Sequence, residues 1–136
     1  MHPPATAARA PAVHERVYPA ESRQIRAVRA DLRRLLADCP AAEEVVLCAS
    51  ELATNAALHS DSRQPGGEFT VRTQIQRGYR VTIEVEDSGG VWAGLPALDD
   101  RPHGLDIIRA LAAESGVRLN QTGRTVWARL DWLRPD

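Results

Sequence analysis

Residues 68–87, EFTVRTQIQRGYRVTIEVED, form two runs in which apolar and polar side chains alternate. A period of two residues is typical of a strand with one buried face. The dipeptide Arg77-Gly78 lies between the runs and supplies turn residues. The stretch therefore predicts an antiparallel hairpin, and its buried face is expected to carry Phe69, Val71, Thr73, Ile75, Val81, Ile83 and Val85.

Two helices are predicted on the N-terminal side of this hairpin. Apolar residues recur at steps of three and four over residues 21–38, as on the buried face of an amphipathic helix. Cys39-Pro40 ends that helix, and a second is expected from about Ala41 to His59, with acidic residues in its first turn. A short strand, His14–Tyr18, precedes both helices.

The C-terminal side of the hairpin is expected to add a loop, a helix and a second hairpin. Residues 88–102 are rich in Gly and Pro and predict a long irregular loop, of the kind that is often a functional lid or disordered. A third helix is predicted from Gly104 to about Glu114. The last hairpin turns at Thr122-Gly123.

The composition favours a single core built from small and aliphatic side chains. The chain has 136 residues, of which 43% are hydrophobic and only 4% aromatic. This length suits one domain, which we place at residues 13–133, after an Ala- and Pro-rich tail over residues 1–12 that we expect to be disordered. Thin helices packed closely on a sheet predict an α+β sandwich.

The balance of charge and the lengths of the uncharged stretches argue against nucleic acid and a membrane as partners. The 17 basic residues, all Arg, nearly balance the 18 acidic ones, so no broad positive field favours direct nucleic-acid binding. The longest uncharged stretch, Ser88–Leu98, is far shorter than a membrane-spanning helix. Cys39 and Cys48 are too few for a disulfide framework, so we expect reduced thiols in a cytoplasmic protein.

The first helix carries arginines on its polar face. These are Arg23, Arg26, Arg29, Arg33 and Arg34. Such a face is either an ordinary solvated surface or a docking surface for an acidic protein partner. The sequence leaves both interpretations open.

Polar residues spaced by four lie on one stripe of the second helix. Glu51, Asn55 and His59 recur at a spacing that stacks them along the helix. A carboxylate and an amide in a mainly apolar helix must be exposed, hydrogen-bonded or assigned a ligand, because unpaired burial is costly. A solvent-facing stripe and a ligand site are the two alternatives.

Two further segments combine polar residues with glycine. Asp87 ends the inner strand of the hairpin and is followed by Ser88-Gly89-Gly90, so backbone could approach a ligand beside the carboxylate. Pro102-His103-Gly104-Leu105 begins the third helix, where unpaired amides can hold phosphate oxygens. Each segment taken alone is equally compatible with a plain turn or a helix start.

In this order the segments resemble the nucleotide-binding boxes of the GHKL ATPase and kinase superfamily, and most closely its small bacterial anti-sigma-factor serine/threonine kinases. ELATNAALHS at 51–60 is similar to the first box, EDSGG at 86–90 to the second, and HGL at 103–105 to the third. GRTVWARL at 123–130 resembles the final strand. The likeness covers residues 14–131. It implies the Bergerat fold, a two-layer α+β sandwich whose mixed, mostly antiparallel sheet is covered on one face by three helices.

The resemblance also implies roles for the two polar residues at the centre of the first box. The carbonyl oxygen of Asn55 helps to hold Mg²⁺, which prefers hard oxygen ligands. Glu51 is the general base that takes a proton from the attacking hydroxyl as the γ-phosphoryl group of ATP moves.

The other two boxes are implied to bind the remaining parts of ATP. Asp87 accepts a hydrogen bond from the exocyclic amine of adenine, which favours ATP over GTP because guanine carries a carbonyl there. Gly89 lets the base lie close to the backbone. The amides of His103, Gly104 and Leu105 contact phosphate.

The implied function is an ATP-dependent kinase that phosphorylates a serine of an anti-anti-sigma antagonist protein and sequesters a sigma factor when that antagonist is absent. Homodimers are usual in such a family. Pro102 occupies the first glycine of the usual Gly-x-Gly-Leu box. A protein-binding anti-sigma module with weak or no nucleotide turnover is therefore an alternative, and a small hydrolase or metal protein that uses Glu51 and His59 is a third.

Overall fold

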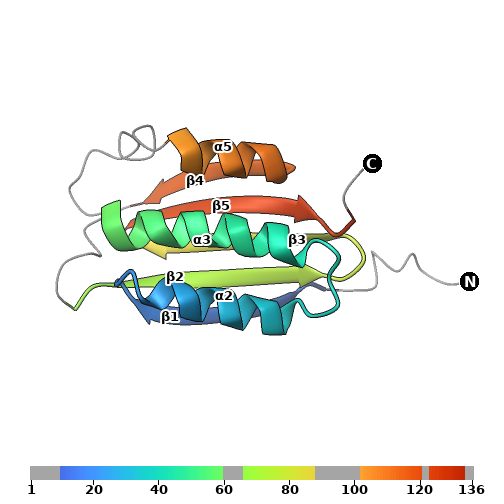
Figure 1. Cartoon of the computed structure of the whole chain (residues 1–136), viewed down its shortest axis with the longest axis horizontal. Helices are drawn as coiled ribbons and strands as arrows, with labels where there is room; N and C mark the ends of the chain where they lie inside the picture. The colour runs from blue at the N-terminus through green and yellow to red at the C-terminus, as the bar shows by residue number, and fades with distance from the viewer. Residues whose placement is uncertain (1–9, 60–65, 88–101, 121–122, 134–136) are drawn as a thin grey trace, which may run out of the picture.

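The computed structural model describes residues 10–59, 66–87, 102–120 and 123–133, without the side chains of His59, residues 102–105 and Asn120. The elements follow the predicted order of strand, two helices, hairpin, helix and hairpin (Figure 1). They are β1 (Ala12–Pro19), α2 (Gln24–Leu35), α3 (Ala42–His59), β2 (Glu68–Gln76), β3 (Arg80–Asp87), α5 (Pro102–Leu111), β4 (Glu114–Asn120) and β5 (Gly123–Asp131).

The strands form one five-stranded sheet in the order β1-β2-β3-β5-β4. The three helices lie on one face of it, with α2 over the β1 edge, α3 over the centre and α5 over the β4 edge (Figure 1). The predicted α+β sandwich with three helices on one face is confirmed. All four pairings of the described strands are antiparallel, so the parallel pair that a mixed sheet implies is not found among them.

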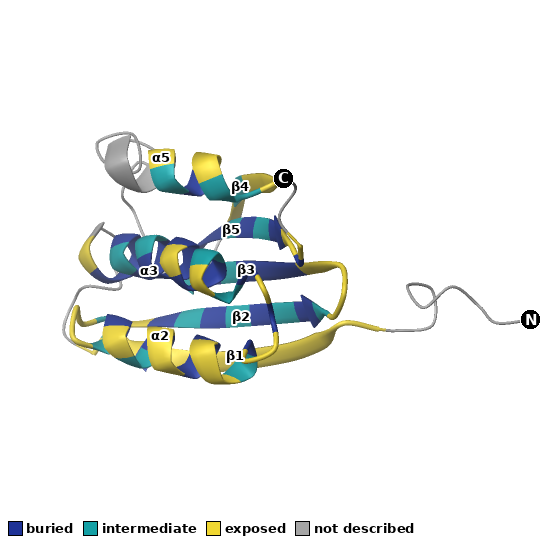
Figure 2. Ribbon diagram, turned by 45° about the vertical axis from the view of Figure 1, so that its right-hand side comes forward, coloured by how far each residue is buried: buried dark blue, intermediate teal, exposed yellow. Residues whose placement is uncertain are grey.

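The predicted hairpin of residues 68–87 is confirmed as β2 and β3. Val71 pairs with Val85 and Thr73 with Ile83, so the alternating apolar residues meet on the face beneath the helices. Gly78 takes a φ of 86° in the turn, a conformation that a residue with a Cβ rarely adopts. Figure 2 shows buried residues along β2, β3 and β5, which alternate with half-buried ones on β2.

The third helix begins and ends earlier than the predicted range of Gly104 to about Glu114. It begins at Pro102 and ends at Leu111, whereas the prediction extended it to about Glu114. Glu114 instead begins β4, where it lies opposite Arg129 of β5 and forms an ion pair with it at 2.6 Å. The sheet thus takes up residues whose local pattern favoured a longer helix.

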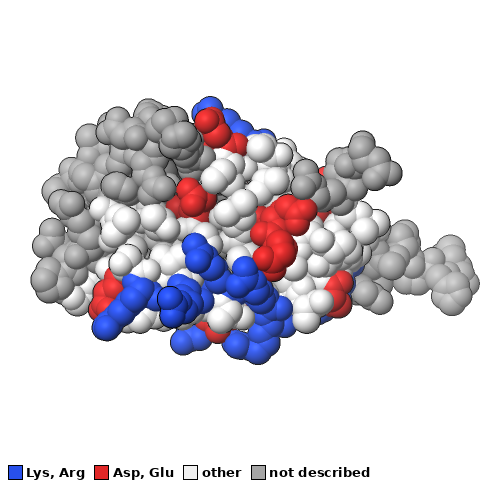
Figure 3. All heavy atoms as spheres, viewed as in Figure 1, with Lys and Arg blue, Asp and Glu red and all other residues white. Residues whose placement is uncertain are grey.

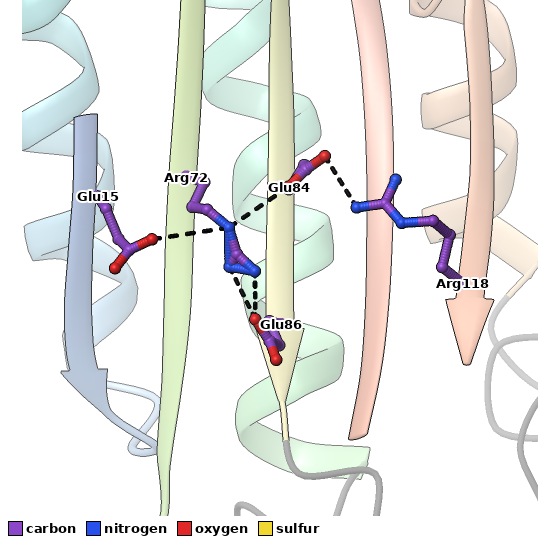
Figure 4. Close-up of polar contacts among 5 residues, drawn as sticks. All are labelled: Glu15, Arg72, Glu84, Glu86 and Arg118. Carbon is purple, nitrogen blue, oxygen red and sulfur yellow. Dashed lines mark hydrogen bonds and ion pairs between the residues drawn. The ribbon is translucent and has the colours of Figure 1, made fainter. Parts of the chain in front are cut away.

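Charged side chains cover part of the sheet face opposite the helices (Figure 4). Arg72 lies between Glu15, Glu84 and Glu86, and its Nη1 donates to Glu86 Oε1 at 2.7 Å. Arg118 reaches Glu84 from the far side at 2.9 Å. These cross-strand pairs give this face a polar surface and oppose edge-to-edge or face-to-face association of apolar groups.

Several predictions fall on residues that are not described. Residues 1–9 of the predicted tail and residues 88–101 of the predicted loop, including Gly89, lie outside the described ranges. The domain limits at 13 and 133 stay a prediction. Within the described ranges, no helix combines the length and the apolar character needed to cross a membrane.

Candidate functional site

Four segments that the sequence singled out meet at one end of the molecule. The C-terminal half of α3, the end of β3, the start of β5 and the start of α5 all lie on the left in Figure 1. α3 packs on β3 and β5, and α5 packs on α3. Residues that are up to 73 positions apart, Glu51 and Arg124, are therefore carried to the same end by the topology.

Asn55 is buried at this end of α3. Only 2% of its surface is exposed, and its Oδ1 has no hydrogen-bond partner in the described structure. The solvent-facing alternative for the stripe is therefore wrong for Asn55. A buried carbonyl oxygen without a partner costs about 1–3 kcal/mol, so its retention indicates an external ligand.

Glu51 lies one turn earlier on α3 and is half-buried. Its charge also affects Cys48, whose thiol is buried: burial first, and then the nearby carboxylates of Glu51 and Glu44, raise the pKa of Cys48 to about 11. Cys48 is thus a neutral thiol at physiological pH, and Cys39 and Cys48 are both free. Glu51 keeps contact with solvent while Asn55 does not. The side chain of His59 is outside the description.

Asp87 is buried in an ion pair. Its carboxylate Oδ2 accepts hydrogen bonds from Arg124 Nη2 at 2.8 Å and Nε at 3.3 Å. Both side chains are 1% exposed. The sequence predicted Asp87 as a site residue but missed Arg124, although alternation along β5 places Arg124 on the same face as the buried Val126 and Ala128.

α5 begins at Pro102, so His103, Gly104 and Leu105 lie in its first turn as predicted. The first four amides of a helix have no acceptor within the helix, and the dipole favours anions there. Pro102 at the first position therefore removes an amide that helix geometry leaves unpaired in any case. Contacts of these residues with phosphate stay a prediction.

A cavity of about 430 Å³ opens between α2 and α3. Its walls combine arginines of α2 with small and apolar residues of α3, and Figure 3 shows arginines gathered over the α2 side of this face. Arg29 Nε donates to Ser50 Oγ at 2.8 Å. The cavity is lined by Ser22, Arg23, Ile25, Arg26, Arg29, Thr54, Ala57 and Leu58.

The family model for a histidine kinase-like ATPase domain, HATPase_c_2, matches residues 18–130. The chain belongs to this family. The match spans all the described strands and helices except the first part of β1 and the last residue of β5. No curated protein matches the chain. The predicted membership of the GHKL superfamily is thus confirmed, and the chain is a histidine kinase-like ATPase domain, a type of domain that implies ATP binding.

The residues present in this ATPase domain fit a hard divalent cation beside ATP. Mg²⁺ takes oxygen ligands and usually draws only one or two from protein, the others being phosphate and water. The buried Oδ1 of Asn55 is a neutral oxygen of the required kind, and no donor from the described part of the chain competes for it. Among the described residues no cluster of three or more His, Cys, Asp or Glu could hold a metal by itself.

Proposed function

We propose that this ATPase domain is an anti-sigma-factor serine/threonine kinase, which transfers the γ-phosphoryl group of ATP to a serine of an anti-anti-sigma antagonist protein. The observation that carries the proposal is the buried, unpartnered Oδ1 of Asn55. An oxygen kept in that state is suited to a Mg²⁺–triphosphate. The half-buried Glu51 one turn away supports phosphoryl transfer rather than binding alone.

Asn55 would hold Mg²⁺ through Oδ1. When bound, the cation shields the charge of the phosphate oxygens. The amides at the start of α5 would bind phosphate oxygens, with the helix dipole favouring the negative charge. Asp87, at the end of β3, would accept the hydrogen bond from the 6-amino group of adenine.

Glu51 would act as the general base. As the serine oxygen bonds to the γ-phosphorus, the bond between that phosphorus and the oxygen leading to ADP breaks, and the serine proton passes to the Glu51 carboxylate. Contact with solvent on one side of Glu51 suits this role because the hydroxyl arrives on another protein.

The arginine-lined cavity is the proposed docking surface for the protein partners. Thr54 and Leu58 line it, and they follow Glu51 by three and seven residues, so they share its side of α3. Arg26 pairs with no acidic side chain in the described ranges and is exposed. An acidic segment of the antagonist or the sigma factor that binds in this cavity would contact its arginines and lie beside the general base, Glu51. A homodimer in the cytoplasm stays part of this proposal.

Thermal unfolding with nucleotide and Mg²⁺ tests the binding step. Ligand at about 100 times its Kd stabilises a protein by about 2.7 kcal/mol, so ATP should raise the melting temperature by several degrees and GTP should not. Asn55→Ala should lose the shift with ATP, while the neighbouring Thr54→Ala, whose hydroxyl donates to Ser50 O within the helix, should keep it. An equal shift in Asn55→Ala would remove the main support for the proposal.

Radiolabelled ATP and a candidate antagonist protein test the transfer step. Glu51→Gln should still be stabilised by ATP and should lose most of the phosphoryl transfer, since a general base contributes about 10²–10⁴-fold. Glu43→Gln, on the same helix but exposed and paired with Arg33, is the matched control. Transfer by Glu51→Gln at the parent rate would show that Glu51 is not the base.

The alternative is a protein-binding module in which nucleotide is weak or absent. One observation favours it: Oδ2 of Asp87 already accepts two hydrogen bonds from Arg124. The absence of any thermal shift with ATP, together with retained binding of an acidic partner that Arg26→Glu abolishes, would support this alternative.

A further inference from the structure

The Asp87–Arg124 pair stands at one end of an otherwise apolar ladder between β3 and β5. On the face beneath the helices, these two strands pair Val81 with Leu130, Ile83 with Ala128, and Val85 with Val126. The next pair on the same face is Asp87 with Arg124. The change from apolar to charged therefore occurs where β3 ends and the candidate site begins.

Stability alone is a poor explanation for this pair. Removing two charges from water costs several kcal/mol for each ion, and well-packed apolar residues often serve as well or better. The preceding pairs of the ladder demonstrate that apolar side chains fill this face without difficulty. A function at the site is the better account of why Asp87 and Arg124 are charged.

The geometry of the pair restricts the Asp87 carboxylate. Nη2 and Nε of Arg124 converge on the same oxygen, Oδ2, at 2.8 and 3.3 Å. Because both side chains are 1% exposed, water does not compete for these bonds. Rotation of the carboxylate about its Cβ–Cγ bond would move Oδ2 away from Arg124, so these bonds restrict the rotation and with it the direction of the other oxygen, Oδ1.

We propose that Arg124 is a positioning residue that sets purine selectivity by holding the Asp87 carboxylate in the orientation that accepts the 6-amino group of adenine. The inference rests on the proposed role of Asp87 in ATP binding. Arg124 acts through Asp87 and itself needs no contact with the nucleotide. Without the guanidinium, the carboxylate turns more freely, so its preference for an amino group over a carbonyl at purine position 6 weakens.

The test compares ATP with inosine triphosphate, which carries a carbonyl in place of the 6-amino group. Affinities are measured by titration calorimetry with Mg²⁺ on the full chain. The wild type should bind ATP more tightly, and Arg124→Met should lower the ratio of the two affinities by about tenfold, the worth of one hydrogen bond to a charged group. Arg129→Met is the control, since Arg129 lies on the same strand and pairs with the exposed Glu114.

A second variant, Arg124→Lys, tests the same inference if Arg124→Met does not fold. Arg124→Lys keeps the buried charge but offers one donor nitrogen where Arg offers two, so it should lower the ratio by a smaller factor. Circular dichroism establishes which variants fold. A merely structural role for Arg124 would weaken both nucleotides equally and leave the ratio unchanged.

Two results would overturn the inference, and both differ from failure of the proposed function. The first is a folded Arg124 variant with the wild-type ratio. The second is a wild type that binds both nucleotides equally, which would show that Asp87 does not read position 6. If the wild type binds neither nucleotide, the proposed function fails and this inference fails with it.

Discussion

Two buried carboxylates, Asp87 on β3 and Asp31 on α2, are neutralised in different ways. Asp87 pairs with Arg124, and both side chains are 1% exposed. Asp31, on α2, accepts a hydrogen bond from the hydroxyl of Tyr18 at 2.5 Å and pairs with Arg16 and Arg34 at 2.5 and 2.8 Å.

The surroundings of the two acids differ in access to water. The side chains of Arg16 and Arg34 are 57% and 70% exposed, so water can replace either of them. Strand register places Tyr18, Phe69, Asp87 and Arg124 in one row across the sheet. This row contains Asp87 itself and Tyr18, which donates a hydrogen bond to Asp31. We expect the exposure of the arginine partners to decide how much unfolding free energy the loss of each pair costs.

The largest expected effect is that of Arg124→Met. It leaves the Asp87 carboxylate buried without its guanidinium, and breaking a buried pair in this way costs about 3–5 kcal/mol of unfolding free energy. Urea denaturation measures the loss. The double variant Asp87→Val with Arg124→Leu, which extends the apolar ladder, should recover most of it while losing stabilisation by ATP. A cost of less than 1 kcal/mol for Arg124→Met would show that water reaches the pair.

Asp31→Asn should have an intermediate effect and lower the free energy of unfolding by about 1–3 kcal/mol. The substitution removes a charged acceptor for Tyr18, while the two arginines remain solvated. Burial alone would raise the pKa of Asp31, but hydrogen bonds from Tyr18 and Arg34 and the charges of Arg16 and Arg34 outweigh it and hold this pKa below its ordinary value.

The lowered pKa of Asp31 gives this prediction a pH dependence. The stabilising contribution of the Asp31 carboxylate is complete above its pKa in the unfolded chain, about 3.9. The contribution is lost as the pH falls through the lower pKa of Asp31 in the folded protein. The difference in unfolding free energy between wild type and Asp31→Asn should be constant above about pH 5 and shrink in more acidic buffer. A difference that grows below pH 4 would contradict the assignment.

Tyr18→Phe should cost about 1 kcal/mol, the net worth of one hydrogen bond. The ring should keep its stacking on Phe69, whose centroid lies 5.5 Å away. Burial, and then the hydrogen bond and charge of Asp31, raise the pKa of Tyr18 well above its ordinary value. The difference in unfolding free energy between wild type and Tyr18→Phe is therefore complete below about pH 10, and it narrows as pH rises further. Thermal melts at pH 7 and pH 11 measure this narrowing.

Much of the fold could be predicted because its signals are periodic. The alternation in residues 68–87 and the spacing of apolar residues in residues 21–38 gave the right elements, in the right order. The end of α5 could not be predicted, because Glu114 joins β4 through long-range pairing with Arg129. Such pairing has no local signature.

The candidate site was predicted only in its local motifs. Asn55 and Asp87 follow from spacing and from the glycines after a strand, and both are buried. Arg124 was missed because a charged residue near a strand end is usually assigned to solvent, although alternation along β5 placed it inward. Asp31 was missed because a charged residue in an amphipathic helix is usually assigned to the solvent-facing side, although it follows the buried Val28 by three residues.

The smallest expected effect is that of Arg16→Met, which removes the same type of side chain from a buried carboxylate as Arg124→Met does. Arg16 is 57% exposed, so solvent screens its pairing with Asp31, and Arg34 and Tyr18 still contact that carboxylate. Its ring contact with Tyr18, 4.9 Å from the centroid, adds little at an exposed position. We expect a loss of less than about 1 kcal/mol by urea denaturation. A loss as large as that of Arg124→Met would mean that exposure of the partner does not decide the cost.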